Sequence, residues 1–356
     1  MAAHPHRKAI PARAASVSIK VGWITAEFPR RPSRRAVWLK SGAMVTMRYR
    51  NLALWLNRNG FRNSFYRAGE DYDAVVIIKT FTDTVLEEVN RLRRKGTPII
   101  FDANVNYYYI WGDYTDPKTH PTPELQRAAI QITRLADHVI ADSEYLRDVV
   151  RDFNPRVTWI PDNVLPMMFR PAKHRAQPGK LRLIWSGISF KADELMLIKE
   201  ALAAVDGLEL WLVSDARPPV MDSLASALPM RWFRYSDLYY AWLLARADAI
   251  ISPRYLNNGY NLGHTEYKIS LGMARCLPAI ASPQPAYVTA IQQGEDSGGI
   301  LCDTSADWQA ALTHLRDNAE ARLQMGRAAR RTIENHYLTP VVAQKLRQVL
   351  LETAKQ

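Results

Sequence analysis

The sequence predicts an α/β fold made of two doubly wound parallel sheets that face each other across a cleft. Short apolar segments alternate with amphipathic segments of helical period, which is typical of parallel strands covered by helices on both faces. The alternation stops over residues 166–179, where three prolines and a glycine show no periodicity, and then restarts. The length of 356 residues suits two domains of ordinary size.

The first domain is predicted over residues 17–165, after a basic tail at 1–16. Apolar spacing from Val45 to Leu56 indicates a helix, with Gly60 as its C-terminal cap. A second helix spans 82–95 and ends at Gly96. Helices also begin after Thr122 and Ser143, whose hydroxyls suit the N-cap position. The predicted strands are 19–25, 73–78, 98–101, 138–141 and 157–160.

The second domain is predicted over residues 181–335, after a linker at 166–180. Its strands are 181–185, 208–213, 249–251, 278–280 and 299–301. One long helix is expected from Ala319 to about Glu352, and its part from 336 onward could pack back on the first domain. The polar side of this helix is expected to carry Arg322, Arg327, Arg330 and Arg331.

Composition and motifs exclude several classes of protein. The chain is 47% hydrophobic, has no apolar run long enough to span a membrane and begins without a secretory signal. Two cysteines argue against a disulfide framework and suit a reducing cytoplasm. The eight histidines and two cysteines show no metal-ligand spacing, so no metal site is expected. A Gly-x-Ser-x-Gly elbow, a Gly-Lys-Ser/Thr phosphate loop and a Gly-x-Gly-x-x-Gly fingerprint are all absent.

The net charge of +12 is uneven, because residues 1–160 hold 25 Lys and Arg against 16 Asp and Glu. Two clusters stand out, Arg30–Arg31 with Arg34–Arg35, and Arg91 with residues 93–95. Such a face could meet nucleic acid, anionic lipid or a phosphorylated substrate, or it could be solvated surface charge. No recognition motif accompanies the charge, so nucleic acid is not expected as a partner.

The most informative segment is residues 257–268, a glycine-bearing polar loop that runs into a helix just after a buried strand. The first N–H groups of a helix lack partners within it, so this arrangement favours anions. Lys268 adds a positive charge in the first turn, where the helix dipole does not favour one. It could also be a solvated lysine. The candidate binding residues of this segment are Asn258, Gly259, Thr265, Glu266 and Tyr267.

Two further segments follow strand ends. Gly187, Ser189 and Lys191 come after the first strand of the second domain and could hold a phosphate, or form an ordinary strand-to-helix turn. Asp102, Asn104 and Asn106 precede a run of tyrosines in the first domain. Carboxylate, amide and aromatic groups bind sugars well, although an Asx-turn with packed tyrosines explains them too. Arg48 and Arg50 could face the cleft or lie on an exposed helix face.

The second half resembles the donor-binding core of retaining, nucleotide-sugar-dependent glycosyltransferases of the GT-B fold, of the group 1 or family-four type. Residues 247–253, the Asn-Gly loop, Lys268 and residues 272–282 carry the resemblance, together with 136–146 and 159–163 of the first half. The resemblance implies a nucleotide-diphosphate sugar as donor, bound by a Rossmann-like second domain without a metal or other cofactor. A glycan or lipid-linked acceptor is expected on the first domain, in surface polysaccharide or glycoconjugate assembly. Lys191 and Lys268 would stabilise the leaving diphosphate, while Asp102 and Asn104 would position a sugar.

The chain departs from this family at two glutamates spaced eight apart, whose positions are Gly263 and Leu271 here, and at an arginine replaced by Ile188. The first hypothesis is therefore a cytoplasmic hexosyltransferase-like enzyme, with attachment to anionic lipid on the inner membrane face as a further expectation. The alternative is a GT-B-like sugar- or partner-binding protein without catalysis.

Overall fold

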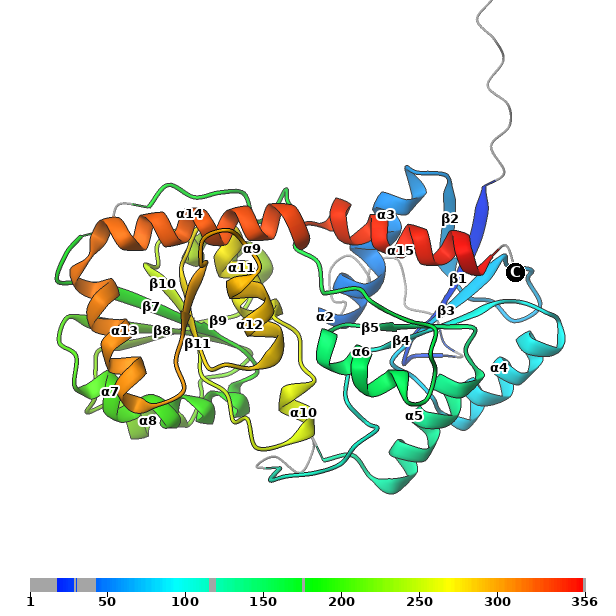
Figure 1. Cartoon of the computed structure of the whole chain (residues 1–356), viewed down its shortest axis with the longest axis horizontal. Coiled ribbons are helices and arrows are strands. Elements are labelled where there is room, and N and C mark those ends of the chain that lie inside the picture. The colour runs from blue at the N-terminus through cyan, green and yellow to red at the C-terminus, as the bar shows by residue number, and fades with distance from the viewer. Residues whose placement is uncertain (1–17, 29, 31–42, 115–119, 175–176, 355–356) are drawn as a thin grey trace, which may run out of the picture.

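The computed structural model describes residues 18–28, 30, 43–114, 120–174 and 177–354. The predicted tail at 1–16 and three arginines of the first basic cluster, Arg31, Arg34 and Arg35, lie outside these residues. Two lobes stand side by side in Figure 1, and the C-terminal helices run along both of them. Each lobe is built on one six-stranded sheet, and all strand pairs in both sheets are parallel. The predicted fold class is confirmed.

The switch point of the first sheet, where successive connections run in opposite directions, lies between β1 (Ile19–Ile24) and β3 (Ala74–Ile78). Its spatial order is β2 (Phe61–Phe65), β1 (Ile19–Ile24), β3 (Ala74–Ile78), β4 (Ile99–Ala103), β5 (His138–Ala141) and β6 (Val157–Trp159). The chain leaves β1 toward one edge to form β2 and then crosses back to form β3. Ligands of such sheets bind beyond the carboxyl ends of the strands at this switch point.

The second sheet has its switch point between β7 and β10. Its spatial order is β12 (Gly299–Leu301), β11 (Ala279–Ala281), β10 (Ala249–Ser252), β7 (Leu181–Ser186), β8 (Leu208–Ser214) and β9 (Met230–Arg234). This is the strand order of dinucleotide-binding sheets: β7, β8 and β9 lie on one side of the switch point, and β10, β11 and β12 lie on the other.

Helices cover both faces of each sheet and bury one apolar cluster on each face. In the first domain they are α2 (Ala43–Val45), the π-helical turn η1 (Thr46–Arg50), α3 (Asn51–Asn57), α4 (Asp83–Arg94), α5 (Pro123–Leu135) and α6 (Glu144–Arg151). In the second they are the 3₁₀ segment η3 (Ser189–Ile198), α7 (Lys199–Ala203), α8 (Val220–Leu224), α9 (Asp237–Leu244), α10 (Gly259–Leu262), α11 (Tyr267–Ala274), α12 (Pro285–Gln292), α13 (Ser305–Asp317) and α14 (Ala319–His336). The last helix is α15 (Thr339–Thr353).

Local sequence signals fix the helix starts. The side chains of Thr82, Thr122 and Ser143 each accept a hydrogen bond from the backbone N–H three residues later. These hydroxyls satisfy amides that have no partner inside the helix, which is why each helix begins there. The two predicted N-caps, Thr122 and Ser143, are confirmed, and Thr82, predicted as the first residue of its helix, is that helix's N-cap.

Two strands were not predicted, β2 and β9. Both lie at sheet edges, where only part of each side-chain row is covered, and β9 reads Met-Arg-Trp-Phe-Arg. Edge strands tolerate charged residues because one side of the strand faces solvent. The apolar runs that reveal the buried central strands are therefore missing from these two.

The prediction of one helix from 319 to about 352 is wrong, because the helix is interrupted at Tyr337 and Leu338. Pro340 in the first turn of α15 cannot donate the amide that a continuous helix would need. At the break the chain pairs with the segment before the linker: Val164 N–H donates to Tyr337 O, and Thr339 N–H donates to Val164 O. α15 then packs on α3 of the first domain.

The predicted polar face of this helix also needs correction. Arg327 and Arg331 are exposed, but Arg322 and Arg330 are 2% and 8% exposed. Arg322 donates to the carbonyls of Gln177 and Lys180, and Arg330 to those of Phe169 and Ala274. These buried guanidinium groups hold the linker against α14, since backbone carbonyls supply the partners that solvent would otherwise give.

Candidate functional site

The turn after β7 lies at the switch point of the second sheet and has room for only a hydrogen at Gly187. A Cβ built there would lie 2.8 Å from the Trp185 ring and 3.3 Å from Lys268 Nζ. A larger residue would therefore have to displace the Trp185 ring or the Lys268 side chain. Ser189, two residues on, starts η3, and its N–H donates to the Asp215 carboxylate at 2.7 Å.

Three cations gather around this turn from three separate elements. Lys191 comes from η3, Lys268 from the first turn of α11 and Arg254 from the loop after β10. Arg254 forms an ion pair with buried Glu194 at 3.2 Å, and Lys268 Nζ lies 3.6 Å from the same carboxylate. Lys191 Nζ donates to Tyr260 Oη at 3.2 Å. One carboxylate thus opposes three positive charges, which leaves the cluster electropositive.

Burial and mutual repulsion lower the pKa of both lysines. Burial is the main cause for Lys191, followed by Arg254 and Lys268, and its pKa falls to about 7. Burial also lowers the pKa of Lys268 to about 8, although Glu194 acts in the opposite sense. An anion bound among these groups would restore the charged forms, because opposite charge favours protonation of an amine.

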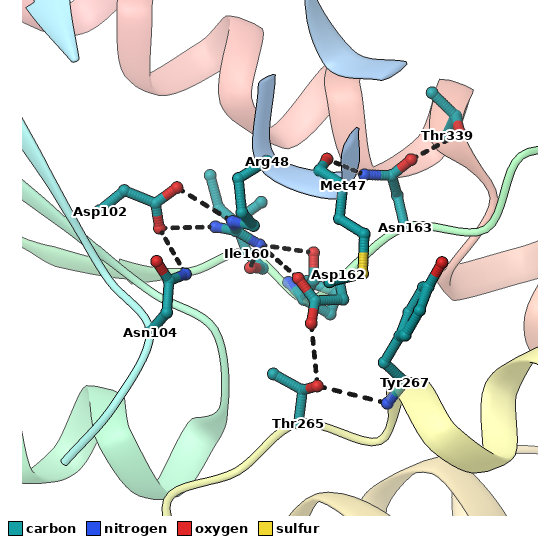
Figure 2. A network of polar contacts seen from close by, with 11 residues as sticks. Met47, Arg48, Asp102, Asn104, Ile160, Asp162, Asn163, Thr265, Tyr267 and Thr339 are labelled. Atoms are coloured by element: carbon teal, nitrogen blue, oxygen red, sulfur yellow. Dashed lines mark hydrogen bonds and ion pairs between the residues drawn. The ribbon is translucent and has the colours of Figure 1, made fainter. Parts of the chain in front are cut away.

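The segment before α11 connects the two domains. Thr265 Oγ1 donates to the Asp162 carboxylate of the first domain at 2.9 Å and accepts from Tyr267 N–H (Figure 2). Glu266 is 1% exposed, and burial, followed by Asp162, raises its pKa well above the ordinary value. Tyr267 lines a cavity of about 140 Å³ with Arg50 and Tyr235. Among the candidate binding residues of segment 257–268, only Lys268 is brought to Gly187 by the contacts described.

Asn258 and Gly259 lie where the second domain touches the first. Asn258 caps α10 by accepting from Asn261 N–H at 2.8 Å, and its amide group donates to Asp113 O. Gly259 N–H donates to Trp111 O, and Gly259 O accepts from the Asn106 side chain. The polar groups that the sequence offered to an anion are thus engaged by the first domain.

Asp102 and Asn104 belong to a buried network at the carboxyl end of the first sheet. Arg48, 1% exposed on η1, donates Nε and Nη2 to the two Asp102 oxygens at 2.9 Å each (Figure 2). The Asn104 amide donates to Asp102 at 3.1 Å. Arg48 also binds the carbonyls of Ile160 and Pro161. Asp102 is therefore occupied by a structural partner, and Arg48 lies inside the domain and not on an exposed face.

Sequence reasoning missed Arg254 and Glu194. Arg254 follows Pro253 directly after a buried strand, and polar residues at a strand end were the signal that led to Asp102. Glu194 had no such signal, because it lies inside η3, whose apolar residues show no clear period. Within the described ranges, no group of three His, Cys, Asp or Glu side chains is arranged to hold a metal ion. No helix there is both long and apolar enough to cross a membrane.

No protein-family model and no curated protein matches the sequence. Solved structures do match. Sucrose-phosphate synthase from Thermosynechococcus elongatus is similar with a TM-score of 0.71 and 12% identity, over 94% of this chain and 98% of that one. HepE from Anabaena, solved with UDP and glucose, has a TM-score of 0.67 and 10% identity over 94% and 100% of the two chains.

TarM from S. aureus, solved with UDP and α-GlcNAc-glycerol, has a TM-score of 0.58 and 14% identity. That match covers 78% of this chain and spans 56% of TarM. At these identities the likeness concerns the fold, and it extends over both sheets and their arrangement. The chain has the GT-B fold of these glycosyltransferases.

Proposed function

We propose that the protein transfers a hexose-like sugar from a nucleoside-diphosphate donor to a glycan or lipid-linked acceptor. The observation that carries this proposal is the cluster of Lys191, Lys268 and Arg254 around Gly187, at the switch point where ligands of such sheets bind. A diphosphate is the ligand that needs several fixed positive charges. UDP is the first nucleotide to test, since it is present in the HepE and TarM structures.

The cations would act on the leaving group. When the bond between the anomeric carbon and the β-phosphate oxygen breaks, its electron pair stays on the phosphate. Charge therefore develops on the leaving diphosphate, next to Lys191 and Lys268, and fixed charges aimed at developing charge lower the barrier. With retention of configuration, which the resemblance supports, the acceptor hydroxyl attacks the face that the phosphate leaves and its proton passes to a phosphate oxygen.

We propose that this neutralisation works without a metal ion, because side chains already supply the positive charge. Addition of EDTA should leave transfer unchanged, whereas a loss that Mg²⁺ or Mn²⁺ restores would contradict the idea. The configuration of the product, read from the anomeric coupling in its NMR spectrum, tests retention separately.

The acceptor side of the proposal rests on the first domain. Tyr109 and Trp111 are 43% and 44% exposed beside the loop that meets α10, and exposed aromatic faces suit sugar rings. Positive charge concentrated in residues 1–160 supports attachment to anionic lipid and hence a lipid-linked acceptor at the inner membrane face. Binding to vesicles with and without anionic lipid tests this; equal binding to both would refute it.

The decisive experiment is thermal unfolding with UDP, GDP, ADP, CMP and dTDP, on the wild type and on Lys268→Ala. A nucleotide at 100 times its Kd should stabilise the fold by about 2.7 kcal/mol. One diphosphate that stabilises the wild type and not Lys268→Ala supports the donor site and identifies its base. No stabilisation by any of them would refute it.

A non-catalytic binding protein is the second candidate. It is favoured by the absence of two glutamates of the family that the chain resembles, whose positions are Gly263 and Leu271 here. Gly263 has little room for a side chain, because a Cβ there would lie 3.0 Å from Asn106 Cβ, and Leu271 is buried in the core. Slow hydrolysis of the bound nucleotide sugar, or transfer to an added glycan, supports the enzyme. Binding of the nucleotide sugar without either reaction supports the second candidate.

A further inference from the structure

Lys79 stands directly after β3, at the switch point of the first sheet. Its φ of +42° lies in the left-handed region, which a residue with a long side chain rarely adopts. Its N–H donates to the backbone carbonyl of Asp102 at 3.0 Å beside the β3–β4 ladder, which places Lys79 next to a residue of the network in Figure 2. Strained backbone that the surroundings hold in place is concentrated at functional sites.

The ammonium group of Lys79 is half-buried and has no hydrogen-bond partner among the described residues. The strand ends beside it meet the segment of the second domain that holds Lys191: the Asn106 side chain donates to Gly259 O, and the next residue, Tyr260, accepts from Lys191 Nζ. In keeping with this placement, the charge of Lys79 is a minor cause, after burial and nearer cations, of the lowered pKa of Lys191. Burial lowers the pKa of Lys79 and Asp142 acts in the opposite sense, while burial raises the pKa of the Asp142 carboxyl well above its ordinary value. Lys79 therefore lies at the edge of the first sheet that meets the second domain, without a hydrogen-bonded acceptor for its ammonium group among the described residues.

The two switch points thus face each other with like charge. Lys79 lies at the switch point of the first sheet, while Gly187 and the cation cluster lie at the switch point of the second. Like charges held near one another across a cleft repel, and an anion between them removes the repulsion. The ligand that fits is one that both domains can touch at once.

We propose that Lys79 binds the diphosphate of the donor from the first domain and so completes, across the cleft, the cation cluster of Lys191, Lys268 and Arg254. This rests on the proposed function. The charges support it: once a bound anion has restored the charged forms of both lysines, three cations and Glu194 leave two net positive charges on the second domain, matching a donor diphosphate that carries two negative charges. Lys79 supplies a third, which matches the additional charge that a nucleoside diphosphate gains on leaving. Its effect should therefore be larger on the leaving group than on the intact donor.

Substitutions at Lys79 separate this role from a structural one. Lys79→Asn removes the charge while keeping a residue that tolerates positive φ, and Lys79→Gly removes the strain as well. Both should unfold at or above the wild-type temperature and yet bind UDP at least tenfold more weakly, with affinity for uridine unchanged. Lys79→Arg should keep UDP affinity within threefold. Lys95→Ala, an exposed lysine of the same domain, is the matched control and should change nothing.

Isothermal titration with UDP, UDP-glucose and uridine gives the affinities, and steady-state kinetics of transfer give the KM for the acceptor. The expected loss is greater for UDP than for UDP-glucose. Unchanged UDP affinity in Lys79→Asn and Lys79→Gly would overturn the inference, as would equal loss of UDP and uridine. A raised KM for the acceptor alone would assign Lys79 to the acceptor and overturn it too. If the wild type binds neither UDP nor any other nucleoside diphosphate, the proposed function itself fails. That result is distinct from a failure of the inference about Lys79, in which the wild type binds UDP and the variants bind it equally well.

Discussion

Binding of a nucleoside diphosphate should take up a proton through Lys191, and its affinity should fall as the pH rises. In the free protein, burial and the neighbouring Arg254 and Lys268 lower the pKa of Lys191 to about 7. At pH 7 about half of these amines are charged, and at pH 9 about one in a hundred. A bound diphosphate returns the pKa toward its ordinary value near 10.4, so only the charged form binds well.

The size of the effect follows from these two pKa values. Between pH 7 and pH 9 the competent fraction falls about 50-fold, which is a loss of roughly 2.3 kcal/mol in binding free energy. The terminal phosphate is already largely ionised over this range, since its second pKa is near 6. Loss of affinity with rising pH therefore reports on the protein. Lys268, with a pKa of about 8, would add up to about tenfold.

Isothermal titration at pH 7, 8 and 9, each in two buffers of different ionisation enthalpy, measures both affinity and proton uptake. Lys191→Arg is the matched variant, because a guanidinium group stays charged throughout. It should lose the 50-fold component and keep only that of Lys268. Wild-type affinity that changes less than threefold, or an unaltered pH profile in Lys191→Arg, would refute the reasoning.

Three substitutions test the rest of the framework. Gly187→Ala should weaken diphosphate binding at least tenfold, as measured by titration, because its Cβ would meet the Trp185 ring at 2.8 Å and push the turn into the site; wild-type affinity would contradict this. Arg48→Ala should lower the free energy of unfolding by about 3–5 kcal/mol, since it leaves Asp102 buried without its partner; a loss under 1 kcal/mol in urea unfolding would exclude that role. Gly112→Ala should loosen the contact between domains, because a Cβ there would lie 1.8 Å from Asn257 O, and hydrogen exchange at the Asp113 and Gly259 amides, which donate across this contact, should rise while the sheets stay protected.

The fold was largely predictable because buried parallel strands carry an unmistakable local pattern. The segment that became β3 is apolar throughout, and those that became β5 and β10 are apolar except for one terminal residue each, His138 and Ser252. The edge strand β9 and the break at Leu338 were missed for opposite reasons. β9 is only partly covered by its neighbours, and the break depends on pairing with Val164, far away in the sequence.

The site was predictable only in part, because sequence shows which groups exist but not which partners they meet. Gly187, Lys191 and Lys268 follow strands or open helices of one sheet, so topology alone brings them together. Asp102 has the same local signal, yet Arg48, 54 positions earlier, takes both of its oxygens. Arg322 and Arg330 likewise seemed suited to a solvated helix face until backbone carbonyls of the linker were found against them.

The crossing of α15 onto the first domain has a consequence for how the molecule is made. Val342, Leu346 and Leu350 belong to the same apolar cluster as β1 and β3. A chain that emerges from the ribosome N-terminus first must therefore hold its first lobe unfinished while the whole second lobe is synthesised. The first lobe is therefore the last to be completed. A fragment that ends at the linker would lack α15 and so part of the first lobe's hydrophobic core.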